Sequence, residues 1–150
     1  MNKFDKKVKD ALIELNLWNE NIKEDEELWY FEKEGRDYCY VLRDNGKEID
    51  SFTLLSFTIP FPDDAIPTIY FAAADVNNHH SVARICLHSH LFEDKGKMDN
   101  NLMGLQFDVP KALISDVKEA IEIGIKKLDD LYAEWDRVLS ELFGGENNDE

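Results

Sequence analysis

Residues 28–60, LWYFEKEGRDYCYVLRDNGKEIDSFTLLSFTIP, contain the alternating aromatic and β-branched runs that decide the fold. Two turn signals, Glu34-Gly35 and Asn45-Gly46, divide this stretch, and Asn-Gly between such runs is a strong hairpin signal. We therefore expect a meander of three antiparallel strands, at about 28–33, 37–43 and 49–58. Apolar residues fall on both faces of the third strand, so we expect it to be central and covered on both sides.

The segments on either side of the meander carry helical spacing. Upstream, the residues of 4–17 place Phe4, Val8, Leu12 and Leu15 on one face of a short amphipathic helix. Downstream, the segment 66–78 is ambiguous, because its residues 68–71 favour a strand by propensity. Asp63-Asp64 ahead of Pro67, and the alanines that follow, favour a helix. Of the two, we expect the helix.

The rest of the chain predicts two strands and a long closing helix. The strands fall within SVARICLHSHLFED at 81–94 and NLMGLQFDV at 101–109, and the helix runs from about Pro110 to Phe143. The apolar stripe of that helix steps by three or four residues: Ile114, Val117, Ile121, Ile125, Leu128, Leu131, Trp135, Val138 and Leu142. At a rise of about 1.5 Å per residue the helix exceeds the diameter of a small domain, so its last turns are expected to project.

These elements define one α+β domain over 1–150, with the order α-β-β-β-α-β-β-α. We expect a five-stranded, mainly antiparallel sheet packed by helices, a core within about 4–143 and a flexible acidic tail at 144–150.

Composition narrows the classes of partner. The chain has 32 acidic and 17 basic residues, a formal net charge of −15, and 43% apolar residues. Such a field repels nucleic acid and anionic lipid, so neither is an expected partner. No run approaches the ~18 apolar residues of a membrane helix, the first residues resemble no secretion signal, and two cysteines make no disulfide framework. A cytoplasmic location is therefore expected.

The stretch RICLHSH at 84–90 raises the question of a metal site. His88 and His90 could converge on one ion with Glu93, Asp94 or Asp108, whereas Cys86 lies about 13 Å from His90, too far to share it. The alternative fits the alternation better: Ala83, Ile85, Leu87 and Leu91 face the core, and Arg84, Cys86, His88 and His90 form an opposite face. That face is either a contact surface for a partner or simply an exposed face of the sheet. His79 and His80 are expected to interact with the carbonyl groups at the end of the helix before this strand.

Signatures of catalysis are absent from the sequence. It has no glycine-rich phosphate loop, no Cys-x-x-Cys and no His-Glu-x-x-His, so we expect no enzyme activity and no cofactor. The aromatic run that includes Tyr38 and Tyr40 is expected to contribute half of its rings to the core. Its other half would form apolar pockets for a peptide added to the sheet as a strand, so both tyrosines are candidate partner contacts.

Two stretches resemble the superfamily that joins YbjN-domain proteins and class I type III secretion chaperones. They are IYFAAADVNNHHSVARICL at 69–87, similar to that family's second helix and fourth strand, and LQFDVPKALISDVKEAIEIGIKKLDDLYAEW at 105–135, similar to its closing strand and helix. The likeness extends over roughly 28–140, and the proline-containing segment 59–67 departs from it. The resemblance implies a non-enzymatic protein, often a homodimer, that holds an extended segment of a partner polypeptide.

The sequence thus supports first a protein- or peptide-binding chaperone or adaptor. The alternative is an acidic inhibitor or immunity protein that blocks a basic site on its partner. A metal-dependent enzyme that uses His88 and His90 is the third hypothesis.

Overall fold

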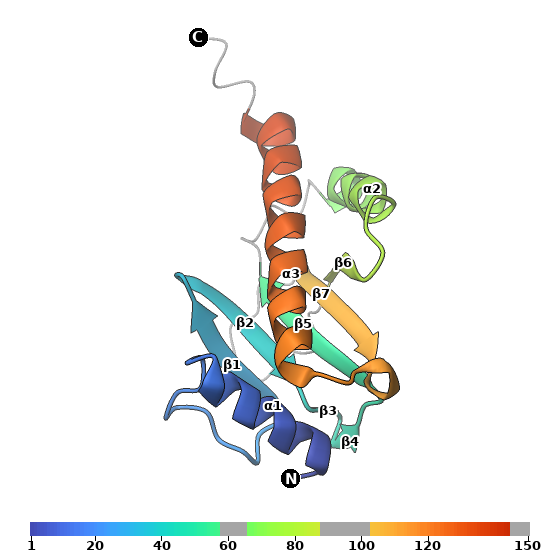
Figure 1. The fold of residues 1–150 in the computed structure, drawn as a ribbon. Coiled ribbons are helices and arrows are strands. Elements are labelled where there is room, and N and C mark those ends of the chain that lie inside the picture. Colours follow the sequence, from blue (N-terminus) through green and yellow to red (C-terminus); the bar gives the residue numbers. More distant parts are fainter. Residues whose placement is uncertain (58–65, 88–102, 145–150) are drawn as a thin grey trace.

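The chain was examined as a computed structural model that describes residues 1–57, 66–87 and 103–144. Within these residues, Figure 1 shows the three helices and the five strands of the main sheet in the expected order, with two unpredicted short strands, β3 (Arg43–Asp44) and β4 (Lys47–Glu48), between the second and third strands of the meander. Their bounds are α1 Lys3–Glu14, β1 Leu28–Lys33, β2 Arg36–Val41, β3 Arg43–Asp44, β4 Lys47–Glu48, β5 Ser51–Phe57, α2 Ile66–Asn77, β6 Ala83–Leu87, β7 Met103–Pro110, the 3₁₀ turn η3 Lys111–Leu113, α3 Val117–Leu139 and the π turn η4 Ser140–Gly144. The α+β class is confirmed, and so is the choice of helix for α2.

Five strands form one sheet in the order β1-β2-β5-β7-β6, and every neighbouring pair is antiparallel. The third predicted strand, β5, occupies the centre, where Leu54 lies between Tyr40 of β2 and Phe107 of β7. Leu54 and Leu55 point to opposite faces and neither is exposed to solvent. The expectation of a central strand covered on both sides is therefore confirmed.

Both predicted turn signals form tight turns with two left-handed residues. Asn45 and Gly46 have φ of 52° and 77° and join the short strands β3 and β4. Glu34 and Gly35 have φ of 53° and 79° and join β1 to β2. Two successive positive φ angles match the twist of an antiparallel pair, which explains why a glycine stands second in each turn.

The three helices share one face of the sheet. Residues of α1, α2 and α3 meet there the inward side chains of the strands, among them Trp29, Phe52 and Phe107. In Figure 1, α3 crosses the sheet and extends beyond it, as expected from its length, and the side chains of Glu141, Leu142 and Phe143 are exposed.

One helical residue sets how closely α3 lies to the sheet. Gly124 is buried in α3, and a Cβ atom added to it would lie 2.7 Å from Cδ1 of Leu54 and 2.9 Å from Cδ2 of Phe107. These separations are shorter than van der Waals contact. The absence of a side chain at Gly124 therefore allows the helix backbone to approach β5 and β7.

The start of the closing helix differs from the expectation. Pro110 is the last residue of β7 rather than the first turn of the helix, and Ile114 has extended backbone with φ of −96° and ψ of 116°. The helix begins only at Val117, because the side chain of Asp116 accepts a hydrogen bond from the Glu119 N–H and caps it. The helical spacing of apolar residues extends upstream of Asp116 and predicted an earlier start, but the cap sets the first residue of the helix.

Tyr38 and Tyr40 require a second correction, because both belong to the core on the helix side of the sheet. Their exposed fractions are 1% and 0%, and neither ring is accessible to a partner. The Tyr40 hydroxyl donates to Oδ1 of the buried Asp5 at 2.7 Å, and the Tyr38 hydroxyl donates to Asp129 of α3.

Of the helices within residues 1–57, 66–87 and 103–144, none has the length and apolar character of a membrane span.

We predict that Gly124→Ala destabilises the protein. Because the added Cβ would meet two atoms at 2.7 and 2.9 Å, overpacking should cost about 2–3 kcal/mol, the upper part of its usual range. Alanine in a helix gains about 1 kcal/mol over glycine, so the net loss should be about 1–2 kcal/mol in chemical denaturation. The control is a double-mutant cycle with Leu54→Ala, which removes the contacted methyl group. The double variant should be less destabilised than the sum of the two single variants, and a Gly124→Ala protein as stable as the wild type contradicts the close approach.

Alkaline titration tests the placement of the tyrosines. Burial raises the pKa of Tyr30, Tyr38 and Tyr40 above the ordinary value of 10.0, and the hydrogen bonds to Asp129 and Asp5 raise the pKa of the last two further. Because the pKa of these tyrosines is higher in the folded than in the unfolded chain, their contribution to the free energy of unfolding is complete below pH 10. This contribution is lost as the pH rises through the folded-state pKa values and the hydroxyl groups ionise. Tyrosinate absorbance should show these three of the five tyrosines protonated at pH 11 for as long as circular dichroism shows a folded chain. Ionisation of all five near pH 10 in a folded chain would contradict this placement.

Candidate protein-binding surface

The outer side of α2 exposes two adjacent aromatic side chains. Its inner side is buried against the core through Ile69, Ala73 and Val76. On the outer side, the exposed fractions of Tyr70 and Phe71 are 52% and 82%. Figure 1 shows α2 beside β6, at one end of the sheet. We call the outer side of α2 with Tyr70 and Phe71, together with the outer edge of β6, the α2–β6 surface.

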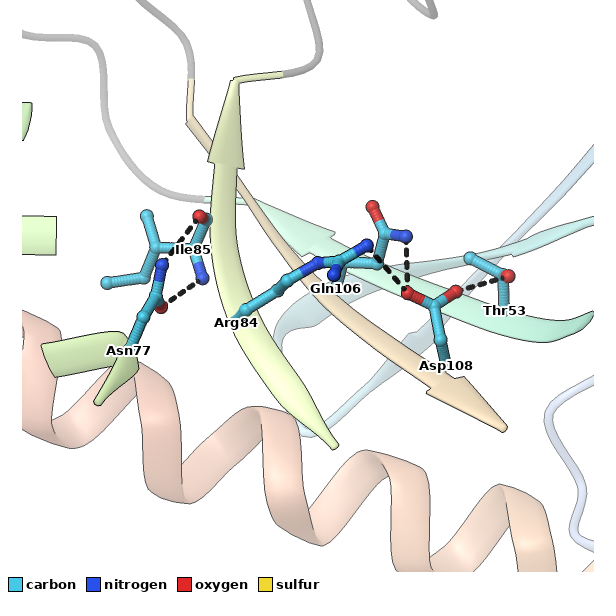
Figure 2. A network of polar contacts seen from close by, with 6 residues as sticks. All are labelled: Thr53, Asn77, Arg84, Ile85, Gln106 and Asp108. Atoms are coloured by element: carbon cyan, nitrogen blue, oxygen red, sulfur yellow. Dashed lines mark hydrogen bonds and ion pairs between the residues drawn. The ribbon is translucent and has the colours of Figure 1, made fainter. Parts of the chain in front are cut away.

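The last residue of α2 is bonded to the edge of β6. Oδ1 of Asn77 accepts a hydrogen bond from the Ile85 N–H at 2.7 Å, and Nδ2 of Asn77 donates to the Ile85 carbonyl at 3.2 Å (Figure 2). Among the described strands, β6 pairs with β7 alone, so Ile85 directs these two backbone groups away from the sheet. The Asn77 carboxamide therefore satisfies both outward groups at the middle of an edge strand.

A second contact attaches the end of α2 to α3. Nε2 of His80 is hydrogen-bonded to Oε2 of Glu134, and Nδ1 of His79 lies 3.9 Å from Oε1 of the same carboxylate. The backbone N–H groups of His79 and His80 donate to the carbonyls of Val76 and Asn77 at the end of α2, as expected for these histidines. Their rings instead lie near the Glu134 carboxylate of α3.

The face of the sheet away from the helices carries a polar network that spans three strands. Asp108 of β7 accepts from the Thr53 hydroxyl of β5 at 2.6 Å, from Nε2 of Gln106 on its own strand, and from Nη2 of Arg84 on β6 at 3.5 Å (Figure 2). Arg84 is 60% exposed, so its guanidinium is also accessible to a partner. Asp108 thus accepts from three donors, and its carboxylate links side chains of β5, β6 and β7 on this face.

Cys86 shares this outward face with Arg84, as the alternation of β6 predicts. Ala83 and Ile85 are buried at 2% and 5% exposure, whereas Arg84 is exposed and Cys86 half-buried. Burial raises the pKa of the Cys86 thiol, and the nearby Arg84 opposes that shift only in part. The thiol is therefore mostly protonated at neutral pH, which makes it a poor nucleophile.

A hollow of about 270 Å³ lies between the end of α2 and the strands β6 and β7. Its lining is polar apart from two residues: Asn77, His80, Ser81, Val82, Ala83, Arg84 and Asp108. Within the parts of the chain that the structure describes, no three histidine, cysteine or acidic side chains are placed to hold a metal ion. His88 and His90, with the carboxylates Glu93 and Asp94, lie outside the described residues.

Two parts of this surface were missed in the sequence. Phe71 could have been found, because the helical stripe that places Ile69, Ala73 and Val76 inward leaves Phe71 on the opposite side of α2. The pairing of Asn77 with Ile85 has no such signal. Asparagine is common in the turns that follow helices, so its presence at position 77 is ordinary. Nothing in the spacing of the sequence indicates a hydrogen bond to a strand residue eight positions later.

Comparison with known proteins gives a match of structure. No protein-family model and no curated protein matches the sequence. The chain is similar in fold to the crystal structure of YbjN from E. coli, which has been proposed to be a transcription regulator. The TM-score is 0.62, and the match covers 91% of this chain and 93% of YbjN at 10% sequence identity. At that identity the match concerns the fold, and it confirms the resemblance expected from 69–87 and 105–135: the chain has a YbjN-like fold.

Proposed function

We propose that the protein is a non-enzymatic adaptor that binds a segment of a partner polypeptide at its α2–β6 surface. The exposed aromatic pair of Tyr70 and Phe71 carries this proposal. Burying apolar area contributes about 25 cal/mol per Å², so a partner that covers these rings gains affinity. Aromatic side chains are also enriched among the residues that dominate protein interfaces.

Charge defines the chemistry of the partner. The net charge of −15 repels acidic surfaces, and Asp75 is exposed on the same helix as the aromatic pair. A partner segment with apolar side chains flanked by lysine or arginine would complement both features. The resemblance to YbjN-domain proteins and secretion chaperones supports the same class of function, including a homodimeric form.

We predict that Phe71→Ser removes partner binding. Proteins retained by immobilised wild-type protein from the native cell, and quantified by mass spectrometry, should include at least one that this variant loses. The affinity of that purified partner should fall at least about tenfold, since truncation of a central interface aromatic costs more than about 1 kcal/mol. The matched control is Leu113→Ser, which changes an apolar side chain of η3 that is 76% exposed. Equal retention by the two variants contradicts the proposal.

The alternative of an acidic inhibitor rests on the excess of 32 acidic over 17 basic residues. Salt separates the two functions, because exposed charges are screened over about 8–10 Å at physiological ionic strength whereas apolar contact is not weakened. We expect raising NaCl from about 0.1 to 0.5 M to weaken partner binding less than about tenfold. A loss of a hundredfold or more, together with an unchanged affinity of Phe71→Ser, would favour the inhibitor.

A further inference from the structure

The edge of β6 has the chemistry of a strand-pairing surface. Backbone groups alternate in direction along a strand, so Arg84 and Cys86 bond toward β7 while Ile85 faces outward. The bond from the Asp108 N–H to the Val82 carbonyl continues the same alternation toward the start of β6. An outward-facing N–H and carbonyl on one residue can accept an added antiparallel strand.

Asn77 occupies that position as a strand residue would. In a hydrogen-bonded pair of antiparallel strands, two opposite residues exchange both N–H to carbonyl bonds. The carboxamide of Asn77 makes the same two bonds to Ile85, one as acceptor and one as donor (Figure 2). Replacing Asn77 by a real strand would therefore conserve both hydrogen bonds of Ile85.

The opposite edge of the sheet has a similar contact. Nδ2 of Asn19, in the segment between α1 and β1, lies 3.5 Å from the Tyr30 carbonyl of β1. Both edge strands of the described sheet are thus met by an asparagine from the segment or helix that precedes them. Natural sheets commonly protect their edges against pairing with other chains.

We propose that Asn77 is an edge guard: it keeps β6 closed to strand pairing, and its release opens β6 to the β6 strand of a second copy. A two-fold axis through Ile85 gives an antiparallel pair in which the two Ile85 residues exchange their backbone bonds. In that register Arg84 lies opposite Cys86 of the second copy, so the two guanidinium groups are not opposed. Pairing requires the last turn of α2 to leave β6, and Asn77 and His80 are the polar side chains that hold that turn in place.

The test uses the full chain without any partner, so its outcome is separate from that of the adaptor proposal. The open variant is Asn77→Ala/His80→Ala. Its control, Asn78→Ala, changes the same residue type at the next position and leaves His79 and His80 beside Glu134. At a concentration where sedimentation shows the open variant to be unpaired, amide hydrogen exchange by NMR should be at least tenfold faster at Ile85 than in the wild type, while Arg84 and Cys86 keep their protection. Sedimentation should show the mass of the open variant rising to twice that of the wild type with concentration.

The control should match the wild type in both measurements. Unchanged exchange at Ile85, equal loss of protection at Arg84 and Cys86, or an unchanged mass of the open variant would each overturn the proposal. The single variant Asn77→Ala retains His80 and provides a readout if the double variant does not fold. It should speed exchange at Ile85 without a change of mass, and wild-type exchange at Ile85 in this variant also overturns the proposal.

Discussion

The close approach of α3 to the centre of the sheet is the constraint on which the other features depend. Gly124 places the helix backbone against Leu54 and Phe107, in strands that are far apart in sequence but adjacent in the sheet. With α3 fixed there, Glu134 in its C-terminal half is hydrogen-bonded to His80, three residues after the end of α2. The position of α2 in turn brings Asn77 to β6 and turns Tyr70 and Phe71 outward.

This arrangement leaves the surface at which we propose that a partner binds accessible on a small acidic protein with a buried sheet core. The core lies between the helices and one face of the sheet, and it engages the inner sides of all three helices. The α2–β6 surface consists of groups that do not take part in this core, namely the outer side of α2 and the outer edge of β6. Contacts at the rim of a fold cost less to open than contacts at its centre, so an element such as α2 is suited to respond to a partner.

Local signals in the sequence predicted most of the fold. Asn45-Gly46 and Glu34-Gly35 encode their turns because two positive φ angles are needed within two residues. The apolar stripe predicted α3 but not its first residue. The helical spacing of apolar residues extends to positions before Asp116, whereas the start of the helix is set by a single hydrogen bond from the Glu119 N–H to the Asp116 side chain. Tyr38 and Tyr40 were assigned to a partner because both faces of the strand are apolar, and only the position of α1 and α3 decides which face is inside.

The candidate site was less predictable, for a physical reason. Alternation along β6 correctly assigned Ala83 and Ile85 to the core and Arg84 to the outside, because a strand has a period of two. The Asn77 to Ile85 bonds and the His80 to Glu134 contact depend on how α2 lies relative to β6 and α3. Such relations are set by tertiary packing, and the residue types involved occur equally in ordinary turns and solvated helix faces.

The most direct test of the account is a map of hydrogen exchange on the protein with and without a bound native partner. The account predicts that added protection is concentrated in residues 66–87, on α2 and β6, with α1 and β1 unchanged. Protection concentrated on α1 and β1, with residues 66–87 exchanging as in the isolated protein, would contradict a binding function at the α2–β6 surface.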